Sequence, residues 1–171
     1  TVESKKLAET LVATTKNTLT FSYHRSDVPN TQEAKSTLFA CVRFLVLPEI
    51  LRSCKRVMVL DIDCMVMKHF DFPKNSIGYF PRDYETRKET KVAAGVLYFD
   101  VSAINITQEI RKEIKKIPMK WYDDQIVLDQ VLSKVPRESV TCFDQTFMDW
   151  DFIKDTTIWT GKGKRKYRNK K

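Results

Sequence analysis

Hydrophobic residues follow two different spacings along the chain, one typical of helices and one typical of strands. Helical spacing predicts amphipathic helices at 4–16, 36–47, 106–117 and 123–132. Short apolar runs predict strands at 19–24, 57–60, 77–80, 96–99 and 140–143. Pro48 and Pro118 are expected to end the second and third helices, because proline interrupts helical hydrogen bonding. Strands that alternate with helices favour an α/β domain with a mainly parallel sheet.

Length and composition limit the chain to one folded unit. It has 171 residues, 42% of them apolar, which is enough for the buried core of a single domain. No run approaches the ~20 apolar residues that a membrane-spanning helix needs, and no charged-then-apolar leader opens the sequence. We therefore expect a cytoplasmic protein without a transmembrane segment. The polar stretch 82–91 is expected to be a loop.

Charge is distributed unevenly along the sequence. The 30 basic and 22 acidic residues give a net charge of +8, but the last ten residues hold seven basic side chains and no acidic one. The remaining residues carry 23 basic and 22 acidic side chains. We therefore divide the chain into a near-neutral domain at 1–161 and a basic tail at 162–171. A near-neutral domain argues against an extended surface that follows nucleic-acid phosphates.

The four cysteines indicate neither a zinc site nor a disulfide framework. They lie at positions 41, 54, 64 and 142 and form no C-x-x-C pair. Two of them fall in apolar runs, so we expect buried free thiols in a reducing compartment.

Candidate chemistry lies in the segment 57–63, VMVLDID, where an apolar run ends at two carboxylates. Residues i and i+2 of an extended strand point to the same side, so Asp61 and Asp63 are expected to converge at the carboxyl end of a buried strand. Adjacent acids repel unless a cation neutralises them, and Mg²⁺ or Mn²⁺ suits both carboxylates and substrate phosphates. The simpler alternative is a strand end that leads into a solvated turn.

Further short motifs keep a fixed order around this pair. They are an arginine on the preceding helix, Arg43, the D-x-D motif at 61–63, an A-G-V block at 94–96, a D-Q pair at 124–125 and a closing G-x-x-K block at 161–164. In these blocks the sequence resembles glycosyltransferases of the GT-A fold, nearest to family 8, which includes glycogenin and the bacterial lipopolysaccharide galactosyl- and glucosyltransferases. The resemblance covers roughly residues 43–164. It implies a Rossmann-like three-layer α/β sandwich, with a mainly parallel central sheet, in the catalytic domain at 1–161.

The same resemblance implies the activity and its metal site. The chain would move a hexose from a nucleotide-diphosphate sugar, a UDP-sugar, to a glycan or protein acceptor, with retention as in family 8. Asp61 would contact the ribose and the metal, and Asp63 would ligate the metal, Mn²⁺ or Mg²⁺. Asp124 and Gln125 would lie beside the anomeric carbon and are the candidate catalytic residues. A single Asp that acts as an inverting base is the mechanistic alternative.

Four residues would bind the donor substrate by the same resemblance. Arg43 would face the diphosphate or the sugar, and Gly95 would let the backbone approach the sugar closely. Gly161 and Lys164 belong to the closing block, and Lys164 would bind the diphosphate. A metal and a lysine stabilise the negative charge that develops on a departing phosphate.

The sequence departs from the family pattern at several positions. Ile158 stands where the closing block has a metal-binding His, so the metal would use Asp61, Asp63, diphosphate oxygens and water, or an acid such as Asp155. Ala93 replaces the usual Asn and removes one contact to the donor sugar. His24 and His69 do not fit the ligand position. The first nucleotide-binding strand is not recognisable before residue 4, so we expect it to be missing or its nucleobase pocket to be built differently.

Two other functions stay open at this point. A haloacid-dehalogenase-like phosphatase would use Asp61 as nucleophile, Asp63 as general acid and the Asp123–Asp124 pair for Mg²⁺, although Met65 departs from its motif. A nucleic-acid-binding domain would use the basic tail with Trp159 and Tyr167 for stacking. The near-neutral domain makes a nucleic-acid partner the less expected one.

Overall fold

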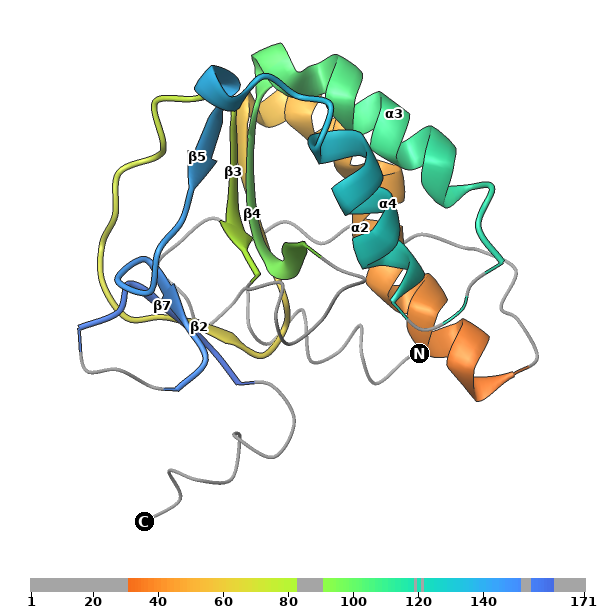
Figure 1. The fold of residues 1–171 in the computed structure, drawn as a ribbon, viewed down its shortest axis with the longest axis horizontal. Coiled ribbons are helices and arrows are strands. Elements are labelled where there is room, and N and C mark those ends of the chain that lie inside the picture. Colours follow the sequence, from red (N-terminus) through yellow and green to blue (C-terminus); the bar gives the residue numbers. More distant parts are fainter. Residues whose placement is uncertain (1–30, 83–90, 119, 121, 152–154, 162–171) are drawn as a thin grey trace.

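A four-stranded sheet with helices against one face forms the centre of the molecule (Figure 1). The computed structural model describes residues 31–82, 91–118, 120, 122–151 and 155–161. The strand order is β1-β4-β3-β5. The strands are β1 (Arg56–Leu60), β3 (Ile77–Pro81), β4 (Val92–Asp100) and β5 (Val140–Cys142). The helix predicted at 4–16 and the strand predicted at 19–24 lie outside the described residues.

Strand directions differ from the prediction of a mainly parallel sheet. Among the described strands, β4 pairs antiparallel with both β1 and β3, and β5 pairs parallel with β3. The reason lies in the connection, because β3 and β4 are consecutive in the sequence and only residues 82–91 join them. Such neighbours can run antiparallel, whereas parallel neighbours need a long crossover. The expectation of a mainly parallel sheet is therefore wrong for this part of the chain.

A second, smaller sheet lies beside the first, as Figure 1 shows. It has the order β2-β7-β6, with β2 (Cys64–Val66) antiparallel to β7 (Ile158–Thr160) and β6 (Met148–Asp149) parallel to β7. These strands are two or three residues long, so their sequences carry too little alternation to predict them. The pairing of β2 with β7 brings the D-x-D segment next to the closing block.

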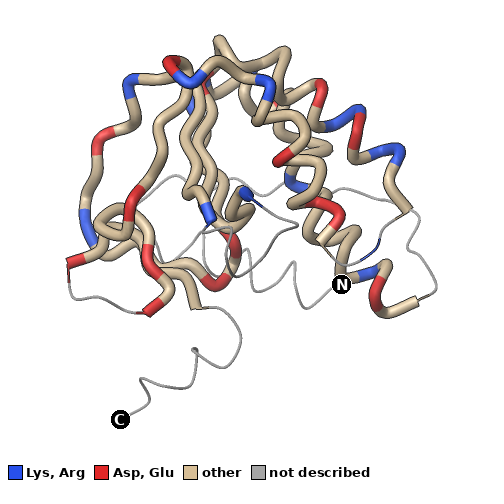
Figure 2. Tube along the Cα trace, viewed as in Figure 1, with Lys and Arg blue, Asp and Glu red and all other residues tan. Residues whose placement is uncertain are grey.

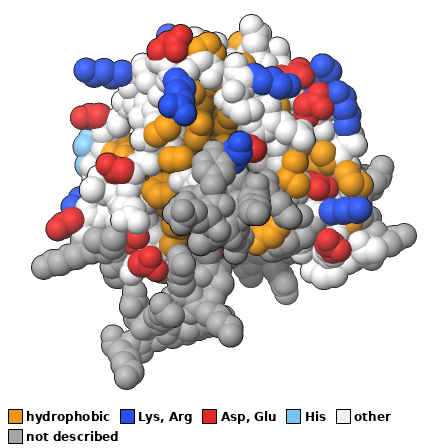
Figure 3. All heavy atoms as spheres, viewed as in Figure 1, with side chains coloured by type: hydrophobic (Ala, Val, Ile, Leu, Met, Phe, Trp, Pro, Cys, Tyr) orange, Lys and Arg blue, Asp and Glu red, His pale blue; other side chains and the backbone are white. Residues whose placement is uncertain are grey.

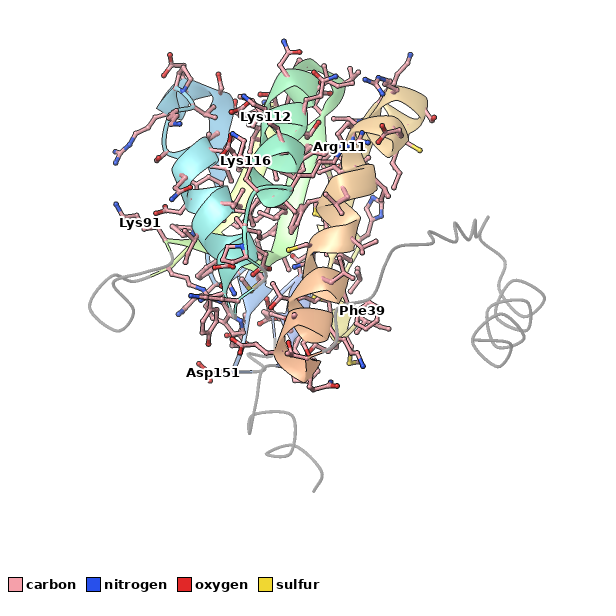
Figure 4. The ribbon with its side chains drawn as sticks, turned by 90° about the vertical axis from the view of Figure 1, so that its right-hand side faces the viewer. Phe39, Lys91, Arg111, Lys112, Lys116 and Asp151 are labelled. Atoms are coloured by element: carbon pink, nitrogen blue, oxygen red, sulfur yellow. The ribbon has the colours of Figure 1, made fainter. Side chains whose placement is uncertain are left out.

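The α-helices of the described residues lie side by side against the sheet, as Figure 4 shows. They are α2 (Gln32–Cys54), α3 (Ile104–Ile114) and α4 (Asp123–Leu132), and short 3-10 turns η1 (Val101–Ala103) and η2 (Arg137–Ser139) precede α3 and β5. The sequence predicted α4 with these same bounds. Arg111 of α3 reaches across to α2 and forms an ion pair with Glu49. No helix in the described ranges is long and apolar enough to cross a bilayer.

Helix α2 is longer than the predicted 36–47. Thr31 caps its start, because the Thr31 hydroxyl accepts a hydrogen bond from the Ala34 N–H at 3.2 Å. Pro48 lies inside the helix and is buried, so the prediction that it ends the helix is wrong. Proline removes one helical hydrogen bond, but the apolar face continues past it to the fully buried Leu51. The helix ends at Cys54, and Lys55, which follows it as the C-cap, has a positive φ of 58°.

Apolar side chains of β4 face two separate cores. Residues 92, 94, 97 and 99 pack against the helices with Phe44, Leu47 and Leu51 of α2, and residues 93, 96 and 98 face a second core with Phe143 and Ile158. A strand covered on both faces reads as a continuous apolar run, as this one does. The two alternating sets are interrupted at Gly95, where the strand changes register.

Candidate functional site

Arg43 joins the D-x-D segment to the D-Q segment. One guanidinium nitrogen, Nη1, pairs with Asp61 Oδ1, and the other, Nη2, lies 3.6 Å from Asp124 Oδ2. Arg43 and Asp61 are mostly buried, with side chains 21% and 25% exposed, and Asp124 is 8% exposed. Partial burial strengthens such ion pairs relative to those on an open surface. Three residues that the sequence singled out separately therefore form one contact network.

A tight turn follows β1 at the D-x-D motif. The Cys64 N–H donates to the Asp61 carbonyl at 3.0 Å, which closes the turn, and the Ile62 side chain between the two acids is fully exposed. The prediction that Asp61 and Asp63 share one side because the backbone is extended is therefore wrong in its premise. The strand ends at Leu60 because the chain must reverse to enter β2. Both carboxylates belong to this one turn.

Gly95 holds the D-x-D turn in place from the neighbouring strand. The Asp61 N–H donates to the Gly95 carbonyl at 2.9 Å, and the Cys64 thiol lies 3.4 Å from the same oxygen. The pairing of β3 with β4 jumps here, because Tyr79 pairs with Leu97 and Phe80 with Ala93. Residues 94–96 therefore have no partner in β3. Such bulges commonly lie beside active sites, where they redirect the backbone.

The closing block meets the same turn on its other side. The Gly161 N–H lies 3.4 Å from the Asp63 carbonyl, and Cys64 pairs with Thr160 in the small sheet. Gly161 is buried. Lys164, the predicted diphosphate ligand, lies outside the described residues. Of the predicted site residues, Arg43, Asp61, Asp63, Gly95, Gly161 and Asp124 are thus linked through direct contacts.

Asp124 and Gln125 are positioned by the start of α4. Tyr122 precedes the helix with a left-handed backbone at φ 71°, and its carbonyl accepts the Gln125 N–H at 2.9 Å. A non-glycine residue in this conformation stores strain that often accompanies functional sites. Gln125 is 8% exposed, although amide side chains usually face water. The turn at Tyr122 therefore sets two polar side chains into the protein instead of toward solvent.

Several buried polar atoms lack hydrogen bonds within the described part of the chain, and two of them lie on Arg43 and Gln125 at the site. They are Arg43 Nε, a donor, and Gln125 Oε1, an acceptor. A buried polar group without a partner costs about 1–3 kcal/mol, so native proteins rarely keep one without a reason. One donor and one acceptor of this kind are suited to a polar ligand such as a sugar or a phosphate.

Two thiols near the site are held neutral. Burial, followed by the charge of Asp124, raises the pKa of Cys41 to about 12, against the smaller opposing effect of Arg43. Burial also raises the pKa of Cys64, and a hydrogen bond with Thr160 opposes that rise. All four cysteines are free, as predicted, but Cys54 and Cys142 are exposed and not buried. They are exposed because one ends α2 and the other ends the edge strand β5.

The described side chains provide only part of the ligand set that a hard cation such as Mg²⁺ or Mn²⁺ needs. No group of three His, Cys, Asp or Glu residues that could hold a metal occurs among the described residues. Ile158, in the place of the family's His, is fully buried in the second core, and Asp155 is exposed and pairs with Lys68 at 3.2 Å. Two carboxylates, Asp61 and Asp63, fit Mg²⁺ or Mn²⁺ bound jointly by protein and substrate phosphates.

Three residues of the site could not be found from the sequence. Cys41 and Cys64 carried no motif, and their proximity to the acidic residues depends on how the segments fold together. Tyr122 precedes the predicted helix, and its left-handed backbone leaves no signal in a non-glycine residue. Neither histidine was predicted to be a metal ligand. His69 is exposed, and His24 lies outside the described residues.

Solved structures with a fold similar to that of this chain include two glycosyltransferases. The chain is similar to a glycosyltransferase involved in the glycosylation of the major capsid of PBCV-1, with a TM-score of 0.54 and 13% identity over 84% of this chain and 78% of that one. Mouse xyloside xylosyltransferase 1, apo form, gives a TM-score of 0.45 and 12% identity over 94% and 72% of the two chains. No protein-family model and no curated protein sequence matches. The first likeness shows a mixed α/β fold like that of a glycosyltransferase, and it does not single out family 8.

Proposed function

We propose that the chain is a metal-dependent glycosyltransferase that moves a hexose from a UDP-sugar to a glycan or protein acceptor with retention. The observation that carries the proposal is the contact network of Arg43, Asp61 and Asp124. The sequence singled out these residues in three separate segments, for one substrate. Chance similarity of short motifs would not require their side chains to meet.

The D-x-D turn would receive the cation and the diphosphate. Asp61 and Asp63 would hold Mn²⁺ or Mg²⁺, which supplies positive charge that stabilises the departing diphosphate. Asp61 would also contact the ribose. The Gly95 carbonyl and the Gly161 N–H fix the backbone of this turn, so the two carboxylates need little reorganisation to bind. Lys164, by its place in the closing block, would add a second charge at the diphosphate.

The start of α4 would receive the sugar. Bond cleavage at the anomeric carbon develops positive charge there, and oxygen atoms of Asp124 and Gln125 can stabilise it. Gln125 Oε1 is buried and has no hydrogen-bond partner within the described residues, so it can accept a bond from a sugar hydroxyl. Arg43 lies between this oxygen-rich side and the D-x-D turn. It is therefore placed to contact the diphosphate or the sugar.

In a retaining front-face reaction the departing phosphate oxygen takes the proton of the acceptor hydroxyl. The chain then needs no dedicated base, and Asp124 is free to face the sugar. An inverting reaction would instead need a carboxylate opposite the leaving group. The anomeric configuration of the first product, followed by NMR, distinguishes the two.

The phosphatase alternative fits the described contacts less well. It would use Asp123 and Asp124 together for Mg²⁺. Asp123 instead accepts the backbone N–H of Lys120 at 2.7 Å, as an acid at a helix start does, and Asp124 pairs with Arg43. The A-G-V bulge beside the D-x-D turn would also have no role in that chemistry.

A donor screen tests the proposed function. Thermal unfolding is measured with a panel of nucleotide sugars, each with and without Mn²⁺, and a generic phosphatase substrate is assayed in parallel. We expect a UDP-sugar to raise the melting temperature by about 2–4 °C at saturating concentration, only with Mn²⁺, because ligands that bind the native state stabilise it. No stabilisation by any nucleotide sugar, together with phosphatase turnover, would replace the proposal with the alternative.

A further inference from the structure

Asp61 has two competing partners, the Arg43 guanidinium and the divalent cation of the proposed reaction. The inference drawn from this competition rests on the proposed function. In the structure Asp61 is paired with the Arg43 guanidinium. In the proposed reaction the same carboxylate holds a divalent cation. A guanidinium and a divalent cation repel each other strongly at such short range in a partly desolvated site. Asp61 therefore cannot serve both at full strength.

The contacts of Arg43 place its positive charge at the D-x-D turn. It bridges Asp61 and Asp124 from α2, and its neighbour Phe44, fully buried in the first core, anchors the helix backbone at this point while the long Arg43 side chain can still change partners. The guanidinium also stacks on that ring, with its central carbon 4.8 Å from the ring centre. Its Nε donor, however, has no hydrogen-bond acceptor in the described ranges. The guanidinium is thus held near the acids while one of its donors stays available for an incoming anion.

We propose that Arg43 competes with the divalent cation for Asp61 and so makes cation binding depend on the nucleotide. Without nucleotide, the guanidinium neutralises Asp61 and lowers the affinity of the turn for the cation. A bound diphosphate brings negative charge that attracts both cations, so Arg43 moves its contact from Asp61 to the phosphate. Cation and nucleotide then bind cooperatively, and by linkage each raises the affinity for the other by the same factor.

Mn²⁺ binding without any nucleotide tests this competition directly. Free Mn²⁺ is measured by its electron paramagnetic resonance signal during titration of the wild type, Arg43→Met and Arg52→Met. Arg52 lies on the same helix, is 53% exposed and, among the described residues, pairs with Glu49 one helical turn away, so it is the matched control for loss of one positive charge. We expect Arg43→Met to bind Mn²⁺ about tenfold more tightly than the wild type, and Arg52→Met to match the wild type.

The same variants are then titrated with UDP present. In the wild type, UDP should raise Mn²⁺ affinity by more than it does in Arg43→Met, because the variant has already lost the competitor. A merely structural role for Arg43 would weaken Mn²⁺ binding in the variant, not strengthen it. Unchanged or weaker Mn²⁺ binding by Arg43→Met in the absence of UDP therefore overturns the proposal.

Two more variants protect the test against misfolding. Arg43→Lys keeps the positive charge but lacks the planar fork of the guanidinium, so it should hold Asp61 less firmly and its Mn²⁺ affinity should fall between those of the wild type and Arg43→Met. In an Asp61→Asn background the gain from Arg43→Met should shrink, and a gain of undiminished size contradicts competition at Asp61. If UDP-sugars bind but the gain is absent, only the competition fails. If no nucleotide sugar binds with or without Mn²⁺, the proposed function fails too.

Discussion

Single residues of the site are arranged so that part of the acidic charge is neutralised before any substrate arrives. Arg43 neutralises Asp61 and also contacts Asp124, and it is packed beside the buried Phe44. This arrangement explains how two acidic motifs can lie close together without unfolding the chain around them. The same arrangement makes Arg43 the residue whose replacement says most about how the site is loaded.

Cys41 gives a residue-scale prediction about pH. Its thiol ionises near 9.0 ordinarily but at about 12 in the folded chain, because it is buried and lies near Asp124. The unfolded chain therefore loses this proton first, and the stabilisation is complete below pH 9 and decreases as the pH rises toward 12. Through this thiol, a rise from pH 9 to pH 10.5 is expected to lower the free energy of unfolding by about 1–2 kcal/mol.

Urea denaturation of the wild type and Cys41→Ala at the two pH values measures that effect. The stability difference between the two proteins should shrink as the pH rises, because the variant lacks the thiol. Cys142→Ala, which removes an exposed thiol, should show a difference that does not change with pH. An equally constant difference for Cys41→Ala would contradict the assigned environment of Cys41.

Elements of the fold place the site by departing from regular geometry. The bulge at 94–96 leaves the Gly95 carbonyl for the D-x-D turn, and the left-handed Tyr122 sets the start of α4. The continuation of α2 through Pro48 carries Arg43 at a fixed distance from β1. Irregularities of this kind persist in a folded chain only if the surrounding packing holds them.

Gly78 tests the packing on the face of the sheet opposite the helices. A Cβ at this position of β3 would lie 2.5 Å from Phe143 Cζ and 3.2 Å from Tyr98 Cβ. Phe143 is buried and stacked on Phe147, with ring centres 4.2 Å apart, so its ring has little room to move. We expect Gly78→Ala to lower the free energy of unfolding by about 1–3 kcal/mol, measured by urea denaturation.

A second background shows whether Phe143 is the cause. Phe143→Leu shortens the side chain that the new methyl group would meet. Gly78→Ala should therefore be less damaging in the Phe143→Leu protein than in the wild type. Equal losses in the two backgrounds would mean that the strain at Gly78 arises elsewhere.

At the scale of the whole molecule, hydrophobic spacing predicted the positions of helices and strands better than the directions of the strands. The bounds of α4 and the place of β1 were predictable because apolar spacing is local. The antiparallel course of β4 was not, because the alternation of strands and helices favoured parallel pairing and did not show that β4 pairs with both β1 and β3. The turn at the D-x-D motif was missed for a related reason: β2 is too short to be recognised, so the reversal that leads into it was not expected.

The sequence predicted which residues belong to the candidate site, but it did not predict the contacts between them. The order of the motifs pointed to Arg43, Asp61 and Asp124, but the ion pairs between them depend on tertiary packing. Cys41 and Tyr122 carry no sequence motif, and their places beside the site depend on packing as well. At the scale of the surface, acidic and basic residues are interspersed over the described chain (Figure 2). In the view of Figure 3 they are spread around the face instead of forming one charged patch. This agrees with the near-neutral composition of residues 1–161.

Calorimetry of UDP binding with Mn²⁺ is the most direct test of the central claim that the D-x-D turn binds a cation and a diphosphate. The proteins compared are the wild type, Asp63→Ala and Asp71→Ala. Asp71 is an exposed acid next to Phe72, which packs on Arg56 at the opposite end of β1, so it controls for loss of one carboxylate.

We predict that the wild type and Asp71→Ala bind UDP only when Mn²⁺ is present, and that Asp63→Ala loses about 100-fold or more in affinity while keeping its melting temperature. Equal affinity of Asp63→Ala and the wild type for Mn²⁺ and UDP would contradict the account.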